Sequence, residues 1–237
     1  MICIFCGSNL NGQNVINDKL PTYNQVLDSM EVRFLQIKDY QVTVDVVMDV
    51  KGIHIPPMMA TIYFKQPDKI HFKSRGFAIF PKNAVAASPV QFRKLADNGK
   101  VSGIEEIENQ KVFHLKLNPE VEDKNISVQI DLWVDQDRWI IKKMRVESNE
   151  FGWMEINNEF QLIDKIFWLP QKSHVLMEVD RKAMTRFRTQ IPMNPESQFK
   201  TPSILNDLFG TGQMYISFRN YKINSGLSDE IFEEENK

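Results

Sequence analysis

The sequence is poor in cysteine, and both of its cysteines, Cys3 and Cys6, lie at the start of the chain. A Cys-x-x-Cys pair can form a redox site or half of a metal site, but no second ligand pair and no strand–helix–strand pattern accompanies this one. We therefore expect neither metal binding nor redox activity from it. The lack of cysteine elsewhere is compatible with an oxidising compartment of the cell envelope.

Long apolar runs and an excess of charge of one sign are also lacking. No run approaches the roughly 20 apolar residues of a membrane-spanning helix, so we expect no transmembrane span. Lysine plus arginine (29) and aspartate plus glutamate (31) nearly balance, and the formal net charge is -2. Without a basic field, no nucleic-acid partner is expected. The 237 residues, 42% of them hydrophobic, suit one globular domain with an ample core.

Catalytic motifs are absent as well. The histidines, His54, His71, His114 and His174, stand apart, without a His-x-x-x-His pair or a carboxylate at ligand spacing. There is no Gly-x-Ser-x-Gly nucleophile motif and no glycine loop for phosphate. We predict that the protein is not an enzyme and needs no metal or cofactor. A hydrolase on a β-rich scaffold is an alternative, which histidines and carboxylates gathered in a cleft would favour.

Residues 1–14 consist of an apolar piece followed by small and polar residues, which is typical of the end of an export signal. A lipid-modified Cys6 is the other interpretation: the small Gly7 and Ser8 after it favour modification, and the bulky Phe5 before it does not. We assign residues 1–18 to an export-signal remnant or a disordered leader, and residues 19–237 to a single domain. We expect this domain to lie in the periplasm.

Residues 126–162 alternate apolar and polar side chains through three successive stretches, which predicts three antiparallel strands. The connections 135–138 and 148–152 are polar and too short for the crossover helix that parallel strands require. Trp133 breaks the polar face, and Lys142 interrupts the apolar one. The apolar positions are Ile126, Val128, Ile130, Leu132, Val134, Ile140, Met144, Val146, Met154, Ile156, Phe160 and Leu162.

The rest of the chain adds helices and further strands. Thr22 and Gln25 form a capping box, after which apolar residues recur at helical spacing up to Asp39. Pro170 is expected to turn a hairpin between its two flanking strands. We predict short helical pieces over 88–95 and 203–209, and strands over 40–50, 60–65, 69–75, 101–108, 111–117, 166–169, 173–179 and 214–223. The fold class is therefore mainly β with few helices (α+β).

An antiparallel sheet with one apolar face and few helices can either pack that face completely or enclose an apolar cavity beneath its helices. The 11 methionines and 16 phenylalanines suit a cavity, since the flexible methionine thioether adapts to variable apolar ligands. Composition by itself favours the packed core.

The order of these elements resembles the LolA-like family of periplasmic outer-membrane lipoprotein carriers. The resemblance implies an unclosed antiparallel β-barrel, or half-barrel, covered by lid helices, which binds the acyl chains of lipoproteins in transit to the outer membrane. It also implies a monomer whose partners are an inner-membrane release complex and an outer-membrane acceptor. The elements that carry it are the helix before Tyr40, the strand 40–50, the hairpin 62–69, the meander 132–146, residues 220–224 and Ile231-Phe232.

The resemblance assigns the apolar faces to an acyl-chain cavity. Its expected lining is Val44, Val46, Met48, Ile62, Phe64, Ile70, Phe72, Leu132, Met144, Met154, Ile156 and Phe160. The expected lid and latch residues are Gln66, Ile204, Leu205, Leu208 and Phe209. In the carriers an arginine before the hairpin proline latches the lid, whereas this chain has Gln66, which lacks the charged fork of a guanidinium. An envelope sensor or receptor domain of the same fold, binding a protein or a membrane-anchored ligand, is the alternative function.

Overall fold

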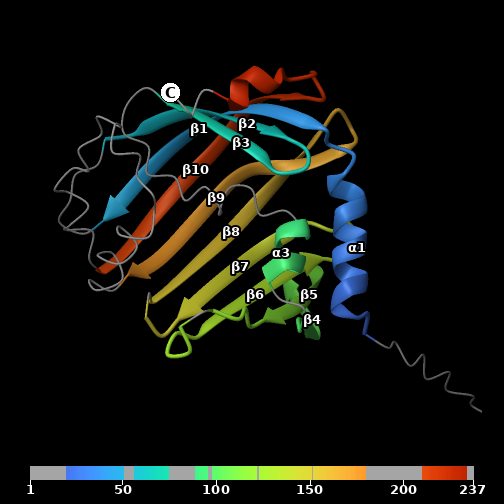
Figure 1. Cartoon of the computed structure of the whole chain (residues 1–237), viewed down its shortest axis with the longest axis vertical. Helices are drawn as coiled ribbons and strands as arrows, with labels where there is room; N and C mark the ends of the chain where they lie inside the picture. Colours follow the sequence, from blue (N-terminus) through green and yellow to red (C-terminus); the bar gives the residue numbers. More distant parts are fainter. Residues whose placement is uncertain are drawn as a thin grey trace, which may run out of the picture.

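The computed structural model describes residues 20–50, 56–74, 89–95, 98–121, 123–150, 152–179 and 210–233. Its main element is one strongly curved ten-stranded sheet in the order β3-β2-β1-β10-β9-β8-β7-β6-β5-β4 (Figure 1). All neighbouring strands are antiparallel, and no pairing within the described ranges joins β3 to β4, so the barrel is open. The strands are β1 (Asp39–Val50), β2 (Met58–Lys65), β3 (Lys69–Ser74), β4 (Lys100–Ile107), β5 (Gln110–Leu117), β6 (Val128–Asp135), β7 (Ile141–Ser148), β8 (Gly152–Ile163), β9 (Phe167–Val179) and β10 (Gly210–Ile223).

The helix α1 (Tyr23–Phe34) begins as the sequence predicts, because Thr22 and Gln25 form the capping box. It ends at Phe34 rather than near Asp39, since residues 35–38 turn the chain into β1. The side chains of its apolar face pack into one cluster with the inner face of the sheet. These side chains are Tyr23, Val26, Leu27 and Met30.

Two shorter helices are held by ion pairs. The predicted helix α3 (Pro89–Leu95) lies against α1, where Arg93 Nη2 is 2.7 Å from Asp28 Oδ1 and 3.3 Å from Glu31 Oε2. The 3-10 helix η2 (Asp229–Phe232) lies beside the β2–β3 hairpin, and its Asp229 Oδ1 is 2.8 Å from the ammonium of Lys69.

One face of the sheet is apolar from strand to strand, because directly opposite residues in an antiparallel pair project from the same face. Alternation along each strand then places all twelve predicted cavity residues on this inner face. In β3, β2 and β1 the opposite partners are Phe72, Ile62 and Val42. Across the strands β1, β10, β9, β8, β7, β6 and β5, in this order, the opposite partners are Met48, Met214, Val175, Ile156, Met144, Leu132 and Leu115.

Lys142, which interrupts the apolar pattern, lies at a β-bulge. Trp133 is opposite Lys143 but Val134 is opposite Ile141, so Lys142 is the extra residue of β7. The bulge keeps Ile141 and Met144 in register with the apolar face. The Lys142 ammonium lies 2.8 Å from Glu108 Oε2 in the turn between β4 and β5.

The hairpin predicted around Pro170 is wrong. β9 is a single strand that runs through this proline, and the turn precedes it, at Asp164 and Lys165. Pro170 is opposite Phe160, next to a register shift between Glu159 and Phe160. An irregular register tolerates a proline because the ladder hydrogen bond that it cannot donate is already missing there.

The inner face predicts a matched pair of stability effects. Leu132 is fully buried, and Leu35, just after α1, is 55% exposed. We expect Leu132→Ala to lower the free energy of unfolding by about 2–5 kcal/mol, since it leaves a cavity in the core. Leu35→Ala should change it by less than about 0.5 kcal/mol. Urea denaturation measures both, and equal effects would contradict the assignment of Leu132 to the core.

Candidate functional site

A cavity of about 380 Å³ lies between the C-terminal half of α1 and the inner face of the sheet. This volume is in the range of small-ligand pockets. Apolar side chains from six strands, from α1 and from the connections between elements make most of its wall. They are Met30, Phe34, Ile37, Tyr40, Phe64, Trp139, Ile140, Ile141, Met144, Met154, Ile156, Phe160, Leu162, Ile166, Phe167, Trp168, Leu169, Val175, Met177, Met214, Ile216 and Phe218.

The cavity has a buried floor and an exposed mouth. Ile156, Val175 and Met214 on the floor are each less than 5% exposed. At the mouth, Leu162 and Ile166 near the β8–β9 turn are 45% and 60% exposed. The cavity can therefore enclose an apolar group at one end and reach solvent at the other.

Two polar side chains on the sheet side of the wall, Ser173 and Asn158, are already hydrogen-bonded to protein. The Ser173 hydroxyl donates to Asn158 Oδ1 at 2.6 Å, and Asn158 Nδ2 donates to the carbonyl of Ile141 at 3.0 Å. An apolar ligand next to this pair would leave neither amide nor hydroxyl unsatisfied.

The predicted cavity residues divide into two groups. Phe64, Met144, Met154, Ile156 and Phe160 line the cavity. The others lie on the same inner face but within the packed core, where α1 and α3 cover the sheet; they are Val44, Val46, Met48, Ile62, Ile70, Phe72 and Leu132. Ligand binding by any of these residues stays a prediction. The lid residues Ile204, Leu205, Leu208 and Phe209 lie outside the described residues.

Sequence reasoning missed the half of the wall that comes from α1 and from β9 and β10. Alternation indicates the strand positions Tyr40, Val175 and Met214, since each lies an even number of residues from another inner-face residue. Phe34 at the end of α1 and Ile37 in the following turn had no such signal, because the helical spacing of the sequence predicts burial without distinguishing a packed contact from a cavity wall.

Gln66 ties the β2–β3 hairpin to the end of α1. Its side-chain amide donates to the carbonyl of Phe34 at 3.2 Å and to that of Ile37 at 3.1 Å. Its backbone N–H donates to the carbonyl of Lys38 at 2.8 Å. Phe34 is the last residue of α1 and Ile37 lies in the turn after it, so the usual i+4 helical donor is missing for both carbonyls; that of Phe34 also accepts from Ile37 N–H at 3.0 Å. A neutral amide thus makes this contact between helix and hairpin, and its control of a lid stays a prediction.

An aromatic cluster lies beside the same end of α1. Tyr40 stacks on Phe64 with ring centroids 5.1 Å apart. The Phe34 ring contacts that of Phe64 at 5.4 Å, and the Tyr221 ring contacts that of Tyr40 at 6.0 Å. Burial raises the pKa of Tyr40 to about 12. Burial and then the charge of Tyr40 raise the pKa of Tyr221 also.

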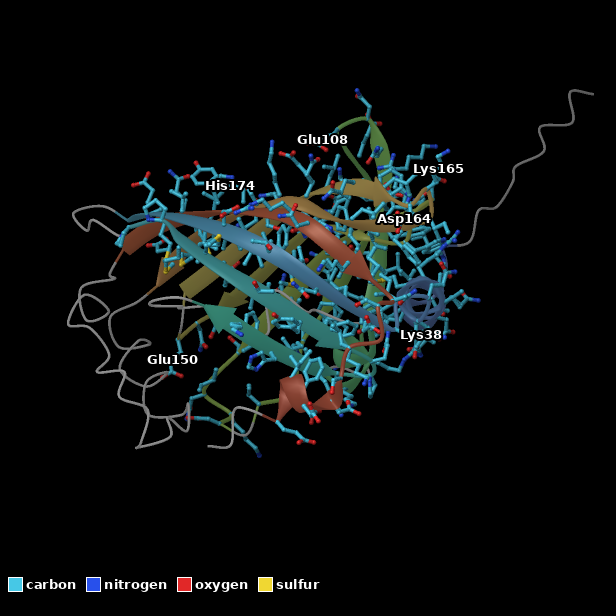
Figure 2. The ribbon with its side chains drawn as sticks, turned by 90° about the horizontal axis from the view of Figure 1, so that it is seen from above. Lys38, Glu108, Glu150, Asp164, Lys165 and His174 are labelled. Atoms are coloured by element: carbon cyan, nitrogen blue, oxygen red, sulfur yellow. The ribbon has the colours of Figure 1, made fainter. Side chains whose placement is uncertain are left out.

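His114 lies on the outer face between two carboxylates. Its Nδ1 is 2.6 Å from Glu105 Oε1, its Nε2 is 2.7 Å from Asp131 Oδ1, and its ring stacks on Trp133 at 4.5 Å. No spacing along the sequence indicated these partners, because strand pairing brings them together from distant positions. None of the described histidines lines the cavity, and Figure 2 shows His174 on the outer face too. Within the described ranges no group of three His, Cys, Asp or Glu side chains could hold a metal ion.

No model of a known protein family and no curated protein sequence matches this chain. Solved structures do match it. A domain from Vibrio parahaemolyticus described as an outer membrane lipoprotein-sorting protein is 9% identical with a TM-score of 0.59, and the match covers 90% of this chain and 97% of that one. A LolA superfamily protein from Nitrosomonas europaea is 14% identical with a TM-score of 0.51, covering 90% and 98%. The fold of this chain is LolA-like.

A DUF1329 family protein from Desulfovibrio piger has the same architecture, at 14% identity and a TM-score of 0.54, with 90% and 97% of the two chains covered. At these identities the likeness is one of fold. It confirms the predicted fold class, because the LolA-like half-barrel is an antiparallel sheet that does not close. None of the described helices has the length and apolar character needed to cross a membrane.

The buried Tyr40 predicts a stability change at alkaline pH. Its pKa rises from about 10 in the unfolded chain to about 12 in the folded protein. The contribution of Tyr40 to the free energy of unfolding is therefore complete below about pH 10, and it decreases by about 2 kcal/mol as the pH approaches 12. Tyr221, whose pKa is also raised, adds a loss of its own. Urea unfolding should therefore show a smaller alkaline loss for Tyr40→Phe than for the wild type, while Tyr215→Phe, at a 45% exposed position of the outer face, retains the full loss. The same alkaline loss in both variants would contradict the burial of the Tyr40 hydroxyl.

Proposed function

We propose that this protein binds acyl chains, foremost those of lipoproteins, in the cavity beneath α1 and carries them through the periplasm toward the outer membrane. It acts without catalysis, by taking up and releasing the chains. The observation that carries the proposal is the apolar cavity of about 380 Å³ with a buried floor and an open mouth.

The chemistry of the wall favours hydrocarbon over a polar ligand. Burial of each methylene group contributes roughly 0.8 kcal/mol, and the polar pair in the wall, Asn158 and Ser173, is satisfied without a ligand. Flexible thioethers adapt to chains of differing length and branching. The methionines of the wall are Met30, Met144, Met154, Met177 and Met214.

The lipoprotein part of the proposal draws on the solved structures. The Vibrio parahaemolyticus domain of the same fold is described as a lipoprotein-sorting protein. An inner-membrane release complex and an outer-membrane acceptor would deliver and receive the cargo of such a carrier. The apolar residues Met1 to Phe5 fit an export signal that directs the chain to the periplasm.

Binding should increase with chain length and disappear when a charge enters the cavity. Fatty acids of increasing length should gain affinity up to about fourfold per methylene, the equivalent of roughly 0.8 kcal/mol, until the cavity is full. Met154→Asp places an unpaired carboxylate in the wall and should abolish binding. Met59→Asp, at a 52% exposed position in β2, is the matched control and should bind as the wild type does.

Displacement of a fluorescent fatty acid measures these affinities, with circular dichroism to establish that both variants are folded. A wild-type protein that binds no chain of any length would overturn the proposal. Equal binding by Met154→Asp and Met59→Asp would move the site away from this cavity.

The contact that Gln66 makes with the end of α1 should affect the rate at which the ligand is released. Gln66→Arg offers charged donors to the carbonyls of Phe34 and Ile37, whereas Gln66→Ala removes both hydrogen bonds. If the end of α1 must move for release, the arginine variant should release a fluorescent fatty acid to vesicles several-fold more slowly than the wild type, and the alanine variant more quickly. Stopped-flow fluorescence measures these rates. Three equal rates would show that this contact does not limit release.

A further inference from the structure

The charged residues at the cavity differ in sign from the protein as a whole. The formal net charge of the chain is -2, yet the charged residues that line the cavity are Arg33, Arg138, Lys165 and Asp137. Three cations thus face one carboxylate. Asp164 precedes Lys165 in the β8–β9 turn but does not line the cavity.

Two of these cations lack an anionic partner. Arg33 and Lys165 make no ion pair with any of the described residues. Arg138, by contrast, lies 4.4 Å above the ring of Trp168, and its Nη1 is 3.8 Å from Asp135 Oδ2 and 3.2 Å from Gln110 Oε1. Elsewhere in the sheet and in α3, Arg93, Lys142, Lys143 and Arg219 are each within 3 Å of a carboxylate oxygen.

The backbone places Arg33 and Lys165 at exposed positions of the cavity wall. Arg33 is in the last turn of α1, at the end that Gln66 ties to the sheet. Lys165 is the second residue of a tight turn in which Asp164 and Lys165 both have positive φ, 50° and 58°, and Ile166 N–H donates to the carbonyl of Ile163 at 3.0 Å. That backbone geometry suits the twist of a hairpin and defines the position of the turn. Figure 2 shows Lys165 at the side of the molecule where α1 lies.

We propose that the ligand of this cavity is an amphiphile with an anionic headgroup, a phosphate or a carboxylate, which Arg33 and Lys165 bind at the mouth. The inference rests on the proposed function, because it assumes that acyl chains occupy the apolar floor. A chain anchored beside Ile156 and Met214 leaves its polar end near Leu162 and Ile166, at the solvent boundary. An anionic group there gains two charge-assisted contacts, one of them with the planar fork of an arginine.

The test compares three ligands with the same chain and different headgroups: dodecyl phosphate, dodecanoate and dodecanol. Each is titrated against the full chain at pH 8, below its micellar concentration, by displacement of a bound fluorescent probe. Inorganic phosphate alone, the fourth ligand, has no chain and should not bind detectably. The variant is Arg33→Gln/Lys165→Gln. The control is Lys73→Gln/Lys222→Gln, which removes the same charge from exposed positions in β3 and β10 that do not line the cavity.

The double variant at the mouth should lose about tenfold in affinity for dodecyl phosphate or dodecanoate and keep its affinity for dodecanol, as expected for two partly screened ion pairs. The control should bind all three as the wild type does. Raising the ionic strength from about 0.05 M to about 0.5 M should weaken binding of the anionic ligands to the wild type and leave dodecanol unaffected. A higher affinity for dodecyl phosphate than for dodecanoate would support a phospholipid as the source of the anion. A higher affinity for dodecanoate would support a carboxylate as the source.

Unchanged affinities for the anionic ligands in the mouth variant, with dodecanol still bound, would overturn the headgroup inference and leave the proposed function standing. Tight binding of inorganic phosphate alone would also overturn it, since the site would then recognise the free ion. If dodecanol and both anionic ligands fail to bind the wild type, the proposed function and the inference both fail.

Discussion

The structure depends on covering one apolar face of a sheet that does not close. A closed barrel hides its inner face by itself, but here β3 and β4 are the two edges and the inner face needs a separate cover. The apolar side of α1 provides that cover over part of the sheet, and its Val26 and Leu27 are completely buried. The cavity lies beneath the C-terminal half of this helix, whose Met30 and Phe34 form part of its wall, whereas Tyr23, Val26 and Leu27 of the N-terminal half belong to the packed core.

The boundary between packed core and cavity is held by contacts at the end of α1. Phe64 is 2% exposed, contacts Phe34 and Tyr40, and also lines the cavity. The amide of Gln66 satisfies the carbonyls of Phe34 and Ile37 at the same place. The position of α1 and the size of the cavity are therefore coupled, and a shift of the helix end would change both. The proposed uptake and release of acyl chains would act through this coupling.

The outer face and the cavity mouth differ in whether their charged side chains have partners of opposite charge. On the outer face, several charged side chains are paired across strands, as with Arg219 and Asp45 or His114 and its two carboxylates. At the mouth, Arg33 and Lys165 have no such partner in the part of the chain that the structure describes. Cross-strand pairing on the outer face stabilises the sheet, whereas cations without a described partner next to an apolar cavity favour an anionic ligand.

The sequence by itself determined the strands and the inner face of the sheet. Alternation with a period of two decides which side chains share a face, and the short polar turns require antiparallel neighbours, so Ile62, Met144 and Ile156 could be placed correctly without a structure. Only the tertiary structure decided which inner-face residues are packed and which line a cavity, because that depends on where α1 ends over the sheet. The same holds for Gln66, His114 and the cations at the mouth. Their partners, or the lack of them, result from contacts between residues far apart in the chain, which no local pattern records.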